Sequence, residues 1–98
     1  MIVVKIKEKS LVISGHAGFA AYGKDIVCAA ASSIVTTSAN NMLSVNQKSI
    51  AYEDDGEKLT IEVLESDELV LKLFNNLKEL LKDLALDYPK NIKIESEE

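Results

Sequence analysis

The amino-acid sequence predicts a single α+β domain in which an antiparallel or mixed sheet is packed by two helices, in the order ββαββαβ. Short segments with alternating apolar and polar residues occur in pairs separated by turn residues, a pattern typical of β-hairpins. Two longer segments repeat apolar residues at helical spacing. A chain of 98 residues has the length of one domain, so residues 1–98 are assigned to it as a whole.

Two hairpins are predicted, one at the N-terminus and one in the middle of the chain. IVVKIK at residues 2–7 and LVISG at residues 11–15 alternate in polarity and are separated by a short polar break. The second hairpin has a strong turn signal, DDG at residues 54–56. Alternation at Leu59, Ile61 and Val63 follows this turn.

The first helix is predicted from Asp25 to about Val45, a segment without Gly or Pro that is dense in Ala and Ser. Its small polar side chains would let another helix or a sheet approach closely, although they are poor helix formers. We expect this helix to be central, or to pack against its symmetry mate in a homodimer. Its apolar residues at helical spacing are Val27, Ala31, Val35, Ala39 and Met42.

The second helix is predicted to start at Ser66 as the capping residue, with carboxylates in the first turn, and to stop at Tyr88-Pro89. NIKIE at residues 91–95 then alternates as a final strand. An arrangement of hairpins requires no parallel crossover. The broad apolar face of the helix comprises Val70, Leu73, Phe74, Leu77, Leu80, Leu81 and Leu84.

Charge and composition exclude several classes of binding partner. The net charge of −5 and a pI of about 4.9 repel nucleic-acid phosphates and favour a basic partner, so no direct nucleic-acid binding is expected. A single cysteine cannot form an internal disulfide, and no signal peptide is recognisable. Charges are expected to interrupt every apolar stretch before the roughly 20 residues that cross a bilayer. The sequence therefore predicts a cytoplasmic protein with no membrane partner.

The only histidine and the only cysteine of the chain, His16 and Cys28, flank a loop bounded by the second strand and the first helix. Asp25 is a good helix N-cap, and Cys28 would then lie in the first turn. Unpaired amides and the helix dipole stabilise a thiolate at that place, although the negative charge of Asp25 opposes this effect. Glycines allow the loop to close, so both side chains can reach one cleft as a catalytic pair.

Other readings of these residues are weaker. A lone cysteine in an Ala-rich helix is more often a small buried hydrophobe, and a lone histidine is more often a surface residue. One His and one Cys are too few for a structural zinc site, so no metal or cofactor is expected. GKD lacks the Ser or Thr of a phosphate-binding loop, and GHAG matches the KH-domain loop by coincidence. Ser32, one turn after Cys28, is a secondary candidate nucleophile.

At these residues the sequence resembles the ribosomal-processing cysteine protease family, Prp, small bacterial proteins marked by Gly-His-Ala and, a short loop later, Asp-Ile-Val-Cys-Ala. The matching segments are GHA at residues 15–17 and GKDIVCA at residues 23–29, with a serine following at Ser32 or Ser33. Length and the order of elements agree as well, so the resemblance spans the whole chain.

The resemblance implies a homodimeric cytoplasmic endopeptidase that removes a short N-terminal extension from a large-subunit ribosomal protein precursor, after a hydrophobic, Phe-containing segment. Cys28 would be the nucleophile, His16 its base, and Asp25 either a helix cap or an orienting contact to the imidazole. The rival classes are a non-catalytic ribosome-associated binding module and a thiol-redox sensor. The loop residues expected to hold the peptide are Gly18, Phe19, Tyr22 and Gly23.

Overall fold

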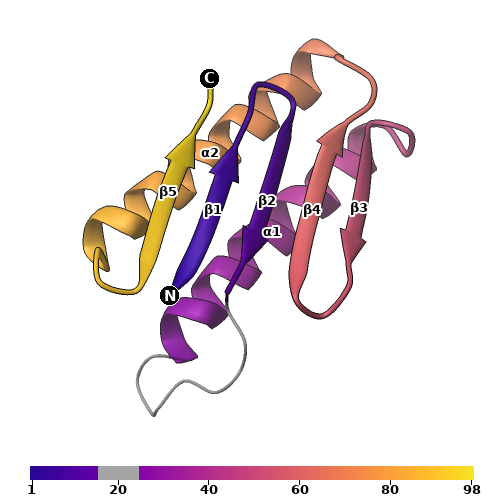
Figure 1. Ribbon diagram of the computed structural model, residues 1–98. Helices are drawn as coiled ribbons and strands as arrows, with labels where there is room; N and C mark the ends of the chain where they lie inside the picture. The colour runs from indigo at the N-terminus through magenta and orange to yellow at the C-terminus, as the bar shows by residue number, and fades with distance from the viewer. Residues whose placement is uncertain (16–24) are drawn as a thin grey trace.

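All seven predicted elements form, in the predicted order. The structure is a computed structural model that describes residues 1–15 and 25–98. The strands are β1 (Ile2–Ile6), β2 (Ser10–Ser14), β3 (Ile50–Asp54), β4 (Lys58–Val63) and β5 (Ile92–Ser96), and the helices are α1 (Asp25–Val45) and α2 (Glu68–Asp87). Both helices lie on one face of the sheet, which gives an α+β fold of two layers (Figure 1).

The sheet is mixed, with strand order β3-β4-β2-β1-β5. The two predicted hairpins, β1–β2 and β3–β4, are antiparallel, and β2 pairs with β4 in the same sense. The remaining pair, β1 with β5, is parallel. The two predicted hairpins do not require a parallel pair. No turn joins β5 to β1, so the local sequence cannot indicate that these strands are neighbours.

The core lies between the sheet and the two helices. Alternate strand residues face the helices, as at Val4 and Ile6 of β1 and Leu11 and Ile13 of β2. The predicted apolar stripe of α1 is confirmed, because all five of its residues are buried: Val27, Ala31, Val35, Ala39 and Met42. Of the small polar residues on this helix, Ser38 is buried and the other Ser and Thr residues predicted to allow close packing are exposed.

The apolar face of α2 is confirmed at its centre and wrong at one edge. Val70, Phe74, Leu77 and Leu81 are buried, whereas Leu80 remains 38% exposed. With about 100° of rotation per residue, Leu80 lies about 100° from Leu81 around the helix axis. A lysine three residues before Leu81 lies about 60° from it, and this residue, Lys78, is buried instead.

Lys78 is buried with its charge paired. Its Nζ donates hydrogen bonds to the backbone oxygen of Glu8 (3.0 Å) and to Oε2 of Glu98 (2.7 Å). The same ammonium lies 4.8 Å from the centre of the Phe74 ring, which places a cation over an aromatic face. Lys78 therefore ties α2 to the β1–β2 turn and to the segment after β5.

This ion pair makes stability depend on pH. The hydrogen bond from Lys78 lowers the pKa of Glu98, with further lowering by the charges of Lys78 and Lys82, while burial opposes the shift. A carboxyl group whose pKa is lower in the folded state than in the unfolded state stabilises the fold at any pH above its unfolded pKa. This stabilisation is lost as the pH falls through the folded pKa. We expect Glu98→Gln to lower the free energy of unfolding at pH 7 and to have little effect near pH 3.

Urea unfolding of both proteins at the two pH values measures this difference. Glu97→Gln is the matched control, since Glu97 pairs with Lys7 at 3.7 Å on the surface, where both side chains are 64% exposed. The control is expected to change stability little at either pH. An equal loss of stability in Glu98→Gln at pH 7 and pH 3 would contradict the proposed role of the charge.

The N-terminus of α2 is capped by Asp67 and not by Ser66 as expected. The backbone N–H of Leu69 donates to Oδ1 of Asp67 (2.9 Å), and Asp67 has the extended backbone of an N-cap residue. Ser and Asp are both common N-cap residues, so the sequence alone did not distinguish Ser66 from Asp67, and the predicted cap was wrong by one residue. At the other end the helix stops at Tyr88 as predicted, where its N–H donates to the Leu84 oxygen (3.0 Å).

α1 corrects the expectation that charges interrupt every apolar stretch. Ile26–Val45 runs for 20 residues without a charged side chain and, by length and composition only, could cross a membrane. The core helix of a soluble protein passes the same test. Here one face of the helix packs into the core, and Ser, Thr and Asn dominate the opposite face. We therefore describe α1 as a core helix of a two-layer fold.

Candidate active site

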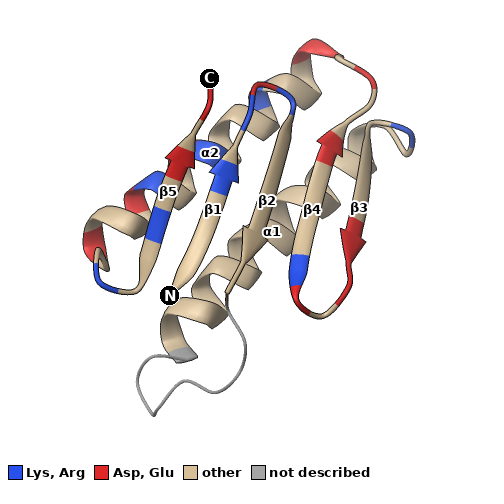
Figure 2. Ribbon diagram, in the orientation of Figure 1, with Lys and Arg blue, Asp and Glu red and all other residues tan. Residues whose placement is uncertain are grey.

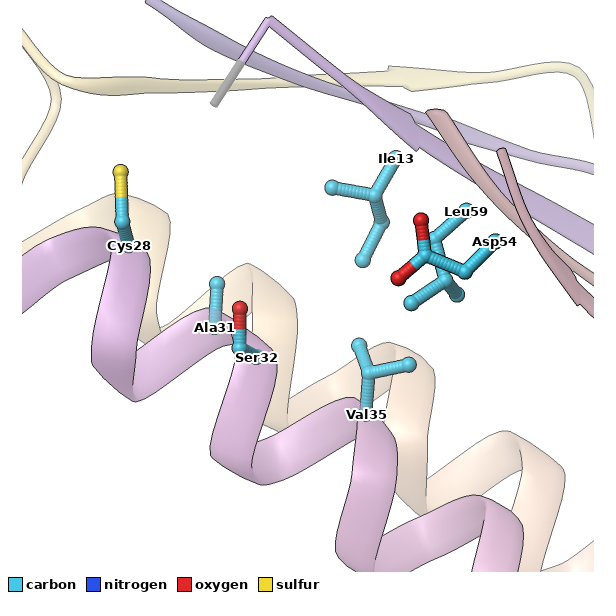
Figure 3. A pocket seen from close by; sticks show the side chains of 7 residues that line it. All are labelled: Ile13, Cys28, Ala31, Ser32, Val35, Asp54 and Leu59. Carbon is cyan, nitrogen blue, oxygen red and sulfur yellow. The ribbon is translucent and has the colours of Figure 1, made fainter. Parts of the chain in front are cut away.

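A small pocket lies where the first half of α1 faces the sheet. In Figure 1 this is the end of the molecule at which β2 finishes, α1 begins and the chain turns from β3 into β4. Three strands and one helix contribute to the pocket, which brings together residues far apart in the sequence (Figure 3). The lining residues are Ile13, Cys28, Ala31, Ser32, Val35, Asp54 and Leu59.

The lining is mostly apolar. Ile13 from β2 and Leu59 from β4 form the sheet side, and Ala31 and Val35 form the helix side. The space open to the centre of a water molecule is about 40 Å³, enough for about three waters. The described residues thus build a mostly apolar floor, to which Asp54 adds a carboxylate.

Cys28 belongs to this pocket and is not sealed in the core. It is the fourth residue of α1, in the first turn of the helix, where the helix dipole favours a negative charge. The residue is half-buried and packs against the edge of the core. Its sulfur points from the helix toward the space beneath the sheet (Figure 3). Cys28 is therefore not fully buried, although part of it packs against the core.

Ser32 lies on the same face of α1, as predicted. The residue is exposed and lines the pocket next to Ala31, one turn beyond Cys28. Its hydroxyl can donate or accept a hydrogen bond toward a ligand in the pocket. The structure therefore places Ser32, the secondary candidate nucleophile, in the same pocket as the thiol.

Asp54 is a pocket residue that the sequence argument did not single out. It was assigned to the turn, and it does accept a hydrogen bond from the Gly56 N–H at Oδ1 (2.9 Å). Its partner in the sheet is Leu59, whose side chain faces the helices. Paired residues point to the same face of a sheet, so this register was the signal that could have placed Asp54 in the pocket.

Asp55, the next residue, has its carboxylate committed to the turn. Its Oδ1 accepts hydrogen bonds from the Lys58 N–H (2.8 Å) and the Glu57 N–H (2.9 Å). These bonds lower the pKa of Asp55, with a smaller contribution from the Lys58 charge. Asp55 therefore shapes the β3–β4 turn, and Asp54 is the acidic residue that reaches the pocket.

Gly15 fixes the direction of the chain as it leaves β2. Its φ of +80° lies in the left-handed region, and a Cβ at this position would overlap the backbone oxygen of Met1. Of the predicted site residues, His16, Gly18, Phe19, Tyr22 and Gly23 lie outside the described residues. The backbone of Asp25 begins α1 as expected, and its carboxylate lies outside the described part as well.

A half-buried thiol at the start of a helix, beside an apolar pocket with a carboxylate at its rim, defines a small α+β protein built for thiol chemistry on a partly apolar ligand. Comparison with known families identifies that chemistry. The family model described as cysteine protease Prp matches residues 1–93, and the chain belongs to this family. It is a cysteine protease.

Individual relatives agree over nearly the full length. The ribosomal processing cysteine protease Prp of Mycoplasma pneumoniae is 34% identical over an alignment that covers 99% of this chain and 96% of the relative. The crystal structure of Prp from S. aureus with a substrate peptide has a TM-score of 0.86 at 24% identity. The same protease with a covalently linked product peptide has a TM-score of 0.83 at 25% identity. Each structure alignment covers 99% of this chain and 100% of the other.

Proposed function

We propose that this protease removes the short hydrophobic N-terminal extension of a large-subunit ribosomal protein precursor during ribosome maturation in the cytoplasm. The observation that carries the proposal is Cys28 on the wall of an apolar pocket, in a chain of the Prp family. Relatives named as ribosomal processing proteases support the substrate class. A net charge of −5 suits a substrate whose mature portion is basic.

Cys28, the only cysteine of the chain, is the proposed nucleophile, and His16 is its proposed base. The imidazole takes the thiol proton as sulfur attacks the scissile carbonyl, and it then gives that proton to the leaving amine. The N-terminal fragment remains on sulfur as a thioester, which water hydrolyses to regenerate the thiol. Backbone amides in the first turn of α1 are suitable donors for the tetrahedral oxyanion.

The remaining predicted residues have supporting roles in this proposal. Asp25 caps α1 or orients the imidazole, and Ser32 contacts the peptide beside the thiol. The loop residues proposed to hold the hydrophobic segment of the precursor are Gly18, Phe19, Tyr22 and Gly23. The proposed mechanism uses the thiol, the imidazole and water, and it requires no metal or cofactor.

The proposed assembly is a homodimer in which α1 packs against its symmetry mate. The outward face of α1 carries no charge, its side chains are small, and Ile26 at its start is 58% exposed. Small, uncharged side chains allow two helices to approach closely, which would bury Ile26 and the Ser and Thr side chains of this face. Sedimentation velocity should show a dimer, and Thr37→Arg, in the middle of the exposed face, should yield a monomer. A monomeric wild-type protein would contradict the proposal.

Cleavage of a precursor peptide tests the function directly. The purified protein is incubated with a peptide that joins a Phe-containing leader to a basic mature sequence, and the products are identified by mass spectrometry. We expect two fragments separated at a single bond after the hydrophobic segment. An intact peptide that nevertheless binds would favour a non-catalytic binding module, and an intact peptide that does not bind would reject the substrate class.

A further inference from the structure

The pocket beside Cys28 contains one feature that peptide-bond cleavage does not use, the carboxylate of Asp54. Figure 3 shows this carboxylate directed from β3 into the pocket, on the side opposite Cys28, with Ile13 and Leu59 beside it. Among the described residues that line the pocket, Asp54 is the only one with a carboxyl group. An acidic group on an otherwise apolar wall lets the pocket favour ligands that carry a hydrogen-bond donor or a positive charge, which apolar contacts alone do not do.

The orientation of this carboxylate is fixed from one side. The Gly56 N–H donates to Oδ1 at 2.9 Å, within the turn that joins β3 to β4. That bond occupies one oxygen, and a carboxylate has several further acceptor positions. The side chain is therefore held in place while it retains the capacity to bind a second donor.

Within the described part of the chain, Asp54 forms no ion pair. The ion pairs found there involve other carboxylates, at Glu79, Glu95, Glu97 and Glu98. Most residues around the turn are acidic, namely Glu53, Asp55 and Glu57, and Figure 2 shows the acidic end of β3 next to the basic start of β4, which is Lys58. A ligand that brings a positive charge to the pocket would meet a field of the complementary sign.

We infer that Asp54 is a specificity-determining residue, whose carboxylate binds a lysine or arginine side chain of the substrate close to the scissile bond. The inference rests on the proposed peptidase function and adds a charge requirement to it. The apolar stem of the basic side chain would lie along Ile13 and Leu59, and its cationic end would reach Asp54. Such a pair near solvent corresponds to about 5-fold in kcat/KM.

A lysine scan tests the inference. The parent peptide contains the Phe-rich leader and has neutral residues around the scissile bond. In the peptide series, one of the three positions on either side of that bond is replaced at a time, once by lysine and once by its neutral isostere norleucine. We expect one position at which wild type cleaves the lysine peptide about 5-fold faster than the norleucine peptide. Asp54→Asn keeps the acceptor for Gly56 and should remove that preference, so that the variant cleaves the lysine and norleucine peptides at similar rates.

Glu53→Gln is the matched control, because Glu53 precedes Asp54 on the same strand and points to the opposite face of the sheet. The control should keep the lysine preference. A wild-type enzyme without a preference at any position, or an Asp54→Asn variant that slows both peptides equally, would overturn the role of Asp54 while leaving the proposed function intact. Failure of wild type to cleave any peptide would instead reject the proposed function. The role of Asp54 would then be tested by binding. The affinities of the lysine and norleucine peptides are measured for Cys28→Ala and for the double variant Cys28→Ala with Asp54→Asn, and a lysine preference that the double variant retains would overturn the inference.

Discussion

Cys28→Ser is expected to reduce peptide cleavage by about 10⁴-fold or more while leaving the fold intact. The hydroxyl of serine is far less acidic than a thiol and is a weak nucleophile without a matched base. Single removals of a nucleophile in other hydrolases cost factors of this order. Because Cys28 is half-buried and the replacement is nearly the same size, α1 should keep its packing. The measurement is kcat/KM on the precursor peptide, together with the thermal unfolding midpoint.

Two further variants sharpen this test. His16→Ala should lose cleavage to a comparable extent, since the proposed dyad acts as a unit. Ser32→Ala is the matched control on the same helix face, and it should reduce kcat/KM by about 10-fold at most, the cost of one hydrogen bond. Retained activity in Cys28→Ser or His16→Ala, with folding unchanged, would reject the dyad.

Phe74→Ala is expected to destabilise the protein by about 3–5 kcal/mol. Phe74 is fully buried, and its ring also lies beneath the ammonium of Lys78. A domain of this size has a total stability of about 5–10 kcal/mol, so the loss is a large fraction of it. Urea unfolding monitored by circular dichroism gives the free energy of unfolding of the variant and the wild type.

Leu86→Ala is the control for this prediction. Leu86 lies on the same helix and is 79% exposed, so its truncation should change stability by about 0.5 kcal/mol or less. A loss below about 1.5 kcal/mol for Phe74→Ala would contradict the assignment of this ring to the core between α2 and the sheet.

The elements of the fold were predictable because each depends on residues close in sequence. Turn residues at 54–56 and polar alternation define the hairpin of β3 and β4, and helical spacing defines the buried stripe of α1. The parallel pairing of β5 with β1 depends on contacts between the two ends of the chain, which no local pattern records. The burial of Lys78 was equally hidden, since its partner Glu98 is 20 residues away in sequence.

The candidate site was predictable to a different extent. Cys28 and Ser32 share one helix face, and their spacing was sufficient to place them together. Asp54 reaches the same pocket through strand register, which the turn assignment of this residue concealed. The dyad with His16 came from the family motif as well as from spacing, and it stays a prediction.

Covalent labelling tests the central claim, that the sulfur of Cys28 attacks the substrate carbonyl. A Phe-containing leader peptide ending in a chloromethyl ketone presents an electrophile at the position of the scissile carbonyl and loses chloride when a nucleophile attacks. Mass spectrometry of the digested protein should locate one adduct on Cys28, with cleavage activity falling in proportion to labelling. Full labelling of Cys28 with activity retained, or loss of activity with Cys28 unmodified, would contradict the account.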